Sequence, residues 1–467
     1  MMIQNKSKYS YLWPDSEISE NKYWKSAGDY FFEREMPEQE GEFKKDSRWP
    51  AFYPSPICMV SSSDGEKSVL ERSVGATIVN RFPYIIALAF CRDNLSKRHY
   101  DRNIFRNMVD ENGSVAVQFL PPGPSFDKAI DAVNKIAEED IYNRIQYSEL
   151  ATHKAFSSDA PVFDCAYMVY EASLVKPCKD FNGNLIYEKP YVDIGSHRLY
   201  FFEIKTIQLR KDIAEGNSQI NWRSLPAWNP VSQDYGYLPK NDSSIMQKKE
   251  YKKGYTANYF FPSSETTAFA YDFIQNDMAI KHLPTKPKDQ VEIDNDKARW
   301  PCFFPSPLTF ITTWADHLIP NIMPCGSTMV VSRHPMTIAV SVAYAAINTR
   351  YNVRATLDIM RKTKTFGCAV PYIDDRIIDA ICYSGNVSFA EDSKKVENAG
   401  LQWEYEKGGP VITALPIHFD CRVIDEIQLG THSMFLGEVC KIKVRKDVRP
   451  VNPIEWIPVT QIHYKNE

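Results

Sequence analysis

Short runs of β-branched and aromatic residues recur along the chain and predict strands. Proline, glycine, serine or aspartate bounds each run, as is typical of strand ends. The predicted strands cover residues 57–60, 85–90, 115–119, 337–342, 366–370 and 434–444. Many short strands with few helices favour a mainly β fold, built as small barrels with peripheral helices.

Two stretches have the periodicity of a helix instead. Apolar residues recur in them at intervals of three to five positions, which places them on one face of a helix. They are Ile130, Val133, Ile136, Ile141 and Ile145 in the first stretch, and Val353, Leu357 and Met360 in the second. We expect both to be peripheral helices of the barrels.

One nine-residue segment occurs twice in the chain. Residues 48–56 read RWPAFYPSP, and 251 residues further on, residues 299–307 read RWPCFFPSP. Four further patches recur in the same order. They pair Gly75 and Thr77 with Gly326 and Thr328, Arg81-Phe82-Pro83 with Arg333-His334-Pro335, Phe163-Asp164-Cys165 with Phe419-Asp420-Cys421, and Gly195-Ser196-His197 with Gly430-Thr431-His432. The shared order indicates a tandem duplication of one domain.

The duplication divides the chain into two domains and a linker. We expect the first domain at residues 1–225, the linker at 226–289 and the second domain at 290–467. The linker is polar and rich in turn residues. Its aromatic segment 255–261 nevertheless favours partial packing onto a domain over a plain flexible tether.

Composition and charge exclude several classes of protein. Of the 467 residues, 43% are hydrophobic, which excludes a disordered chain. The net charge of −4 gives no reason to expect nucleic acid as a partner. The apolar runs are too short for the roughly 18 residues of a membrane span. The ten cysteines form no Cys-x-x-Cys pair, and no secretory signal is recognisable, so we expect reduced thiols, no metal site and a cytoplasmic protein.

The second half of the chain carries an ordered set of short motifs. Between residues 305 and 357 they are Thr312-Thr313, Asn321-Ile322-Met323-Pro324 with Ser327, His334-Pro335, Val340-Ser341 and Thr356. Later motifs are Ser384-Gly385, Lys395 before Ala399-Gly400-Leu401, and Gly430-Thr431-His432 with Phe435, Gly437, Glu438 and Val439. This set resembles the flavin reductase-like family, whose domain is an FMN-binding split β-barrel. The resemblance covers most of residues 300–445.

The resemblance implies an FMN site made of hydroxyl, amide and cationic side chains. Hydroxyls suit the ribityl chain and the polar edge of the flavin ring, because they both donate and accept hydrogen bonds. The implied cofactor-binding residues are Thr312, Thr313, Asn321, Ser327, Thr328, Ser341, Arg350, Arg354, Thr356 and Lys395. The two arginines flank a predicted helix start, which favours a phosphate. Taken singly, each of these side chains also fits a structural or solvated role.

His432 is the implied catalytic residue of this site. Histidine titrates near neutrality, so it is suited to orient NAD(P)H or to modulate the protonation of the flavin. A hydrogen-bonded structural role in the loop stays open for it. The equivalent His197 in the first copy indicates common ancestry only.

The resemblance also implies an activity and partners. The implied function is an FMN-dependent oxidoreductase that transfers hydride from NAD(P)H to the flavin, with FAD as the alternative cofactor. A tailoring oxidase or oxygenase that acts on a bound organic substrate stays open, as does a non-catalytic flavin- or ligand-binding protein. A partner monooxygenase that receives reduced flavin is a further candidate. Domains of this family work as homodimers with the flavin at the interface, so we expect the two copies to form a pseudo-dimer. Further dimerisation stays open.

The first copy departs from the motif pattern at two positions. Leu70 stands where the alignment places Asn321, and Ile104 stands where it places Thr356. An apolar side chain leaves the polar ring edge unpaired, which costs about 1–3 kcal/mol for each group. We therefore expect one FMN per chain, held by the second copy and closed by loops from the first.

Overall fold

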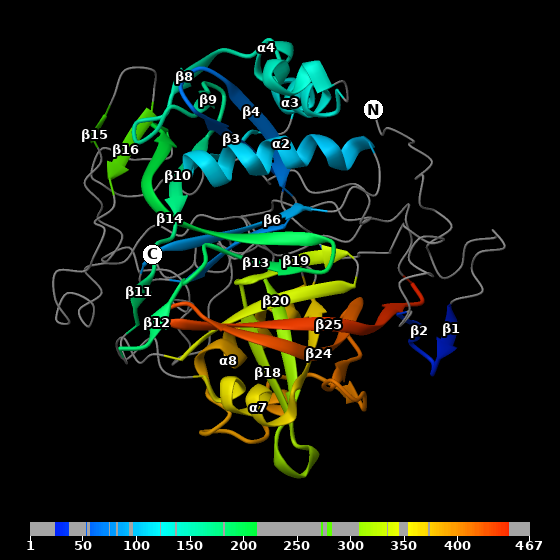
Figure 1. The fold of residues 1–467 in the computed structure, drawn as a ribbon. Coiled ribbons are helices and arrows are strands. Elements are labelled where there is room, and N and C mark those ends of the chain that lie inside the picture. The colour runs from blue at the N-terminus through cyan, green and yellow to red at the C-terminus, as the bar shows by residue number, and fades with distance from the viewer. Residues whose placement is uncertain are drawn as a thin grey trace.

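The chain folds into two large antiparallel sheets (Figure 1). The computed structural model describes residues 24–36, 53, 57–73, 75–80, 83–92, 97–121, 123–135, 138–180, 183–212, 272–273, 278–282, 308–333, 335–344, 354–371 and 374–447. The predicted site residue Arg350 lies outside these residues. So do the aromatic segment 255–261 and, apart from Tyr53, the two copies of the nine-residue repeat.

Seven strands form the body of the first sheet, which we call the first half. They are β3 (Cys58–Ser63), β4 (Ser68–Ser73), β5 (Gly75–Asn80), β6 (Ile85–Cys91), β7 (Ser114–Phe119), β10 (Met168–Leu174) and β14 (His197–Arg210). In space they follow the order β4-β3-β7-β10-β14-β6-β5. Helix α2 (Lys97–Asn112) connects β6 to β7.

The second sheet, which we call the second half, repeats this plan. Its strands are β17 (Thr309–Trp314), β18 (Pro320–Cys325), β19 (Thr328–Arg333), β20 (Met336–Ala343), β21 (Thr365–Val370), β24 (Ile417–Gln428) and β25 (His432–Arg445). Their order in space is β18-β17-β21-β24-β25-β20-β19, and helix α7 (Ala355–Thr363) connects β20 to β21. The two halves therefore share one topology.

Shorter elements connect and cover the two sheets. In the first half they are α3 (Pro124–Val133), η3 (Glu138–Asn143), α4 (Arg144–Tyr147), β8 (Thr152–Lys154), β9 (Pro161–Phe163), β11 (Cys178–Lys179), β12 (Leu185–Ile186) and β13 (Tyr191–Ile194). In the second half they are η7 (Asp316–Leu318), α8 (Asp375–Asn386), α9 (Lys395–Asn398), β22 (Trp403–Glu404) and β23 (Val411–Ile412).

All six predicted strands are present, as β3, β6, β7, β20, β21 and β25, so the expectation of a mainly β fold is confirmed. The second predicted helix is α7. The first predicted stretch is divided among α3, η3 and α4. The five-residue step from Ile136 to Ile141 does not fit the 3.6-residue period of a helix, and α3 has ended at Val133 before this step is reached.

Two short hairpins cross between the halves. The hairpin of β1 (Lys25–Ala27) and β2 (Phe31–Glu35) precedes the first half in the chain but pairs with β25 of the second. The hairpin of β15 (Asp272–Phe273) and β16 (Met278–His282) precedes the second half but pairs with β14 of the first. The two hairpins pair at equivalent positions. β2 starts opposite Arg445, the last residue of β25, and β16 starts opposite Arg210, the last residue of β14. Reciprocal exchange of this kind is typical of swapped dimers.

Two repeated patches of the sequence are not equivalent in the structure. The matching irregularities of the β5–β6 and β19–β20 hairpins make Thr77 equivalent to Met329 and not to Thr328. The Phe419-Asp420-Cys421 patch lies in β24, whereas Phe163-Asp164-Cys165 lies at the end of β9 and in the turn after it. The first-half strand that corresponds to β24 is β10, in which Glu171 pairs with Ala116 as Asp420 pairs with Gly367. This match was therefore wrong, because the same three letters fall in and after the hairpin before β10 in the first half, and in β24 itself in the second.

The two halves meet where β5, β6 and β14 of the first contact β19 of the second, and where β5 contacts β25 (Figure 1). A continuous apolar cluster fills this interface. It includes Val79, Ile85, Ala87, Tyr187 and Phe201 of the first half with Met329, Val331, Ala339, Met434 and Leu436 of the second. At Gly75 an added Cβ would lie 2.7 Å from the Val330 carbonyl oxygen, so glycine permits the close approach of β5 and β19.

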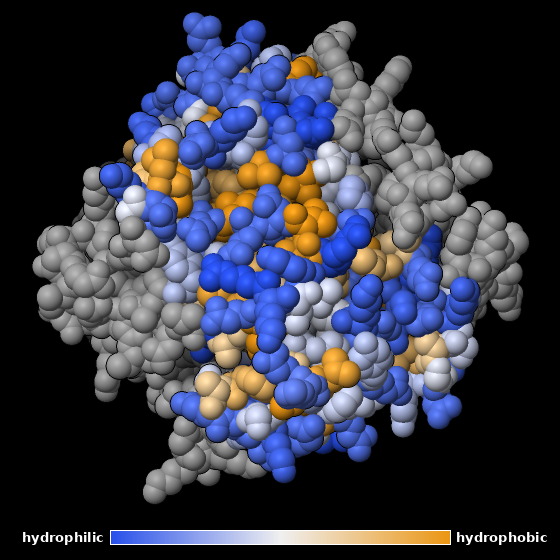
Figure 2. All heavy atoms as spheres, turned by 60° about the horizontal axis from the view of Figure 1, so that its bottom comes forward, coloured by the Kyte–Doolittle hydropathy of each residue, from blue (hydrophilic) through white to orange (hydrophobic). Residues whose placement is uncertain are grey.

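The outer surface is mixed in character. On the face shown in Figure 2, the apolar residues of the described part form patches that hydrophilic residues separate. None of the described helices combines the length and the apolar character that crossing a bilayer requires.

Candidate functional site

Three of the predicted residues form one buried polar cluster. Thr313 of β17 lies opposite Asn321 of β18 in the strand register, and Thr356 lies in the first turn of α7. The Asn321 Nδ2 donates to Thr313 Oγ1 at 3.0 Å and to Thr356 Oγ1 at 3.1 Å. All three side chains are buried. The two threonines therefore hold the amide in one orientation.

That orientation leaves the other side of the amide without a partner. The Asn321 Oδ1 is buried and accepts no hydrogen bond from the described residues. A buried acceptor without a donor costs about 1–3 kcal/mol. The cluster thus presents an acceptor that a bound N–H or O–H group would satisfy.

Two cationic side chains lie close to this cluster. Lys395 begins α9, which packs against β18, and only 4% of its surface is exposed. Burial and, to a smaller extent, the Arg354 guanidinium lower the pKa of its ammonium group to about 7, against the opposing effect of Asp392 and Glu391. Within the described part of the chain, the Lys395 ammonium makes no hydrogen bond or ion pair. A buried cation in this state favours the binding of an anion.

The start of α7 adds to this positive environment. Arg354 directly precedes the helix, and no side chain caps its first N–H groups in the described residues. The first N–H groups of a helix and its dipole attract anions. Arg354 and Lys395 are therefore suited to hold a phosphate.

His432 lies at the same end of the barrel. It is half-buried at the start of β25 and pairs with Ala343, the last residue of β20. The backbone N–H of Arg354 donates to the Ala343 carbonyl at 3.3 Å. His432 and the start of α7 therefore flank one strand end. The structure brings together Thr313, Asn321, Arg354, Thr356, Lys395 and His432.

Two other predicted hydroxyls, of Thr328 and Ser341, already have partners within the protein, and Ser327 is joined to Ser341 through its backbone. The Thr328 hydroxyl bonds to the Tyr53 hydroxyl and lies 3.2 Å from Thr309 Oγ1. The Ser341 hydroxyl donates to the Val79 carbonyl across the interface. Ser327 accepts the Ser341 backbone N–H at its carbonyl, at 2.9 Å. Thr328 and Ser341 thus connect the strands and the two halves.

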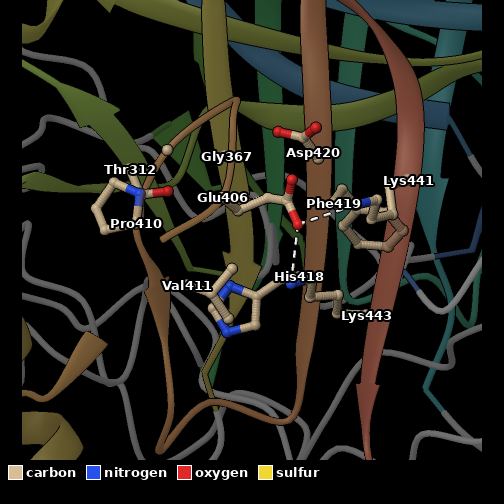
Figure 3. A pocket seen from close by; sticks show the side chains of 11 residues that line it. Thr312, Gly367, Glu406, Pro410, Val411, His418, Phe419, Asp420, Lys441 and Lys443 are labelled. Atoms are coloured by element: carbon tan, nitrogen blue, oxygen red, sulfur yellow. Dashed lines mark hydrogen bonds and ion pairs between the residues drawn. The ribbon is translucent and has the colours of Figure 1, made fainter. Parts of the chain in front are cut away.

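Thr312 points away from the cluster because adjacent strand residues face opposite sides of a sheet. It lines a small cavity on the other face of β17, with a volume of about 10 Å³, enough for one water molecule (Figure 3). The Glu406 carboxylate lies 3.1 Å from Lys441 Nζ and 2.8 Å from Lys443 Nζ. The Asp420 carboxylate faces the same space. Burial, with the nearby charge of Glu406, raises its pKa to about 6.

Sequence reasoning missed this second polar cluster, although a signal for it was present. His418 and Asp420 alternate with apolar residues in β24, and Lys441 and Lys443 alternate with apolar residues in β25. Polar residues at every second position of neighbouring strands share one face. The strand pairs His418–Lys443 and Asp420–Lys441 place them side by side.

The alignment of the first half to the site needs two corrections. Ser62 pairs with Val69 as Thr313 pairs with Asn321, so Val69 and not Leu70 takes the place of Asn321. Four residues connect β3 to β4, whereas five connect β17 to β18, and this extra residue of the second half displaced the alignment. Helices α2 and α7 both end directly before a left-handed residue, Gly113 or Lys364.

The position of Thr356 follows from these matched helix ends. Counting back from Gly113 and Lys364 places Phe105, and not Ile104, at the position of Thr356. Phe105 is 1% exposed, and its ring centroid lies 4.8 Å from that of Phe90. Aromatic packing therefore fills this part of the first half, where the second half has polar groups.

The family model described as "Flavin reductase like domain" matches residues 301–458. This part of the chain is a flavin reductase-like domain. It contains every predicted site residue, and the match supports a flavin as its cofactor.

Known proteins similar to the chain are distant. An "Uncharacterized protein" of Archaeoglobus fulgidus is 24% identical over 124 residues, which is 26% of this chain and 64% of the relative, so the chain spans less than two thirds of that protein. The flavoredoxin of Methanosarcina acetivorans is 18% identical and is matched over 33% of this chain and 86% of its own, with a TM-score of 0.28.

Two further solved structures are similar at the same level. The flavoredoxin of Desulfovibrio vulgaris (Miyazaki F) is 22% identical, covers 33% of this chain and 87% of its own, and has a TM-score of 0.28. The nitrilotriacetate monooxygenase component B of Bacillus cereus is 21% identical, covers 32% of this chain and 76% of its own, and also has a TM-score of 0.28. The assignment of the flavin reductase-like domain rests on the family match and not on these structures.

The raised pKa of Asp420 predicts that ionisation of this carboxyl destabilises the folded domain. Its folded-state pKa of about 6 exceeds the ordinary 3.8, so the folded state holds this proton more tightly. The resulting stability is present below about pH 4 and is lost as the pH rises through about 6. We expect Asp420→Asn to raise the free energy of unfolding by about 1–2 kcal/mol at about pH 8, with no gain at about pH 4. Urea unfolding at both pH values measures the difference.

Asp425→Asn is the matched control, since Asp425 is exposed on the same strand. It should show no such pH-dependent gain. A loss of stability in Asp420→Asn at the higher pH would instead mean that attraction to Lys441 and Lys443 outweighs the cost of burial.

Proposed function

We propose that the chain is a flavin-dependent oxidoreductase that binds FMN in its flavin reductase-like domain and is reduced by NAD(P)H. The observation that carries the proposal is the buried cluster around Asn321, whose amide oxygen has no partner among the described residues, next to the buried ammonium of Lys395, which makes no hydrogen bond or ion pair with them. An acceptor for a ring N–H and a cationic site for a phosphate are the two features that FMN requires.

Each residue of the cluster has a distinct role in this proposal. Thr313 and Thr356 fix the amide of Asn321 so that its oxygen accepts a hydrogen bond from the polar edge of the ring. Lys395, Arg354 and the start of α7 hold the phosphate. His432 lies at the strand end beside Arg354, where it orients the reductant or holds a proton. When bound, the flavin supplies the hydride chemistry itself.

In this proposal the first half covers the flavin site of the second. Its strand β5 accepts the Ser341 hydroxyl at Val79 and contacts the Gly430–His432 turn, so it lies against the domain that holds the site. This arrangement supports an intramolecular pseudo-dimer in which one half binds the cofactor and the other covers it. A partner monooxygenase that takes up reduced flavin is consistent with this assignment.

The direct test is the colour of the purified full chain and its response to a reductant. We expect a yellow protein whose flavin absorbance bleaches when NADH or NADPH is added without oxygen and without a partner protein. A yellow protein that does not bleach would contradict the reductase and favour a flavin- or ligand-binding role, or an oxidase that is reduced by its own substrate. A protein that neither carries nor binds flavin would contradict the proposal altogether.

The role of Lys395 predicts discrimination between FMN and riboflavin, which lacks the phosphate. A hydrogen bond to a charged group contributes about 1.5–3 kcal/mol. We therefore expect Lys395→Gln to weaken FMN binding about 10- to 100-fold and to leave riboflavin binding unchanged. Quenching of flavin fluorescence measures both affinities.

Lys394→Gln is the control for this change, because Lys394 is the exposed neighbour of Lys395. It should bind both flavins as the unchanged chain does. Equal weakening of FMN and riboflavin by Lys395→Gln would place the lysine away from the phosphate.

The replacement of polar by apolar residues in the first half predicts one FMN per chain. Val69 and Phe105 occupy the positions of Asn321 and Thr356 and offer no hydrogen bonds there. Titration of the apo-protein should give a stoichiometry near one, and Asn321→Leu combined with Thr356→Ile should abolish binding. The corresponding pair in the first half, Val69→Leu with Phe105→Leu, should leave it nearly intact. Two equivalent tight sites per chain would contradict this assignment.

A further inference from the structure

The turn that carries His432 is held by a residue of the other half. Asn80, the last residue of β5, is 1% exposed. Its Oδ1 accepts the Thr431 backbone N–H at 2.9 Å, the Thr431 hydroxyl at 2.8 Å and the His432 backbone N–H at 3.2 Å. Its Nδ2 donates to the Pro83 carbonyl at 2.8 Å. Backbone donors on one side and a carbonyl on the other fix which end of the amide is the oxygen.

This arrangement determines the direction of the next hydrogen bond. An amide oxygen only accepts, so the Thr431 hydroxyl gives its single proton to Asn80. The Thr431 Oγ1 also lies 2.7 Å from His432 Nδ1 and can only accept there. The hydrogen of this second bond must therefore come from Nδ1. A neutral His432 then carries its proton on Nδ1, and Nε2 has a lone pair.

The equivalent turn in the first half lacks this constraint. Its Ser196 Oγ lies 2.8 Å from His197 Nδ1 and 3.3 Å from the Ser332 hydroxyl. Ser332 occupies in β19 the place that Asn80 occupies in β5, directly after the irregularity in each hairpin. A hydroxyl both donates and accepts, so this chain of bonds can run in either direction. The bonds of Ser196 to His197 and Ser332 therefore impose neither tautomer on His197.

We propose that Asn80 is a positioning residue for the site in the flavin reductase-like domain. Through Thr431 it fixes the Nδ1–H tautomer of His432, so that Nε2 accepts hydrogen bonds and meets the N–H or O–H donor of a bound ligand. The identity of that ligand as a flavin or a nicotinamide rests on the proposed function, whereas the tautomer does not. The first half thus sets the proton position of a histidine in the second.

The test uses the full chain, labelled with nitrogen-15 and free of flavin. Long-range proton–nitrogen spectra of the imidazole rings, recorded well above the histidine titration range, report the tautomer of each ring. His432→Gln and His197→Gln assign the two signals. We expect His432 to show a protonated Nδ1 and an unprotonated Nε2. In Asn80→Ser, which copies the first-half arrangement, both nitrogen shifts should move toward the averaged values of a tautomer mixture.

The reciprocal change Ser332→Asn is the matched control. It should drive His197 toward the Nδ1–H tautomer and leave His432 unaffected. Should Asn80→Ser fail to fold, Thr431→Val breaks the same link and should release the same tautomer. An Nε2–H tautomer in the unchanged chain, or a His432 tautomer that neither variant alters, would overturn the proposal.

A parallel FMN titration separates this proposal from the proposed function. If the tautomer follows Asn80 but no flavin binds, only the function is wrong. If flavin binds and is reduced but the tautomer does not follow Asn80, only the positioning role is wrong.

Discussion

The backbones of β5 and β19 lie in direct contact, and the other contacts between the halves depend on that approach. A side chain at Gly75 would meet the carbonyl of Val330, so the two strands reach this separation only with glycine between them. At this separation the Ser341 hydroxyl reaches Val79, and the amide of Asn80 reaches the Gly430–His432 turn. Because these bonds lie within an apolar cluster, water does not compete with them.

The two halves have kept one architecture while their polar residues have diverged. Glu171 and Asp420 occupy equivalent strand positions, each under a covering loop. Glu171 accepts the backbone N–H groups of Phe156 and Ser157 at 2.9 and 2.6 Å, together with the amide of Gln208. Asp420 instead faces Glu406 and two lysines next to a small cavity. Glu171 has thus completed its hydrogen bonds within the first half, whereas Asn321 Oδ1 and Thr312 Oγ1 of the second half have no hydrogen-bond partner among the described residues.

Much of the fold could be predicted from the sequence, because strand runs and turn residues are local signals. The gathering of Thr313, Asn321 and Thr356 also followed from motif order. Thr312 was grouped with them although the two-residue period of a strand turns it to the opposite face. Leu70 and Ile104 were wrongly taken as the equivalents of Asn321 and Thr356. Those assignments assumed a constant spacing between the two copies, and a loop that is one residue longer in one copy changes that spacing. Nothing in the local sequence identifies Asn80, since its role exists only once β5 meets a turn from the far end of the chain.

The exchanged hairpins have a consequence for how the protein is made. β1 and β2 leave the ribosome before the other described strands, yet their partner β25 is the last of these strands to emerge, so this hairpin must wait unpaired while all the others are made. The arm at β15 and β16 finds β14 already made and can close the first sheet early. Because the final pairing joins segments so distant in sequence, it carries a large loop-closure cost and forms slowly. A nascent chain of this protein therefore exposes an open sheet edge until β25 has emerged and paired, which makes this interval the period of greatest risk of aggregation.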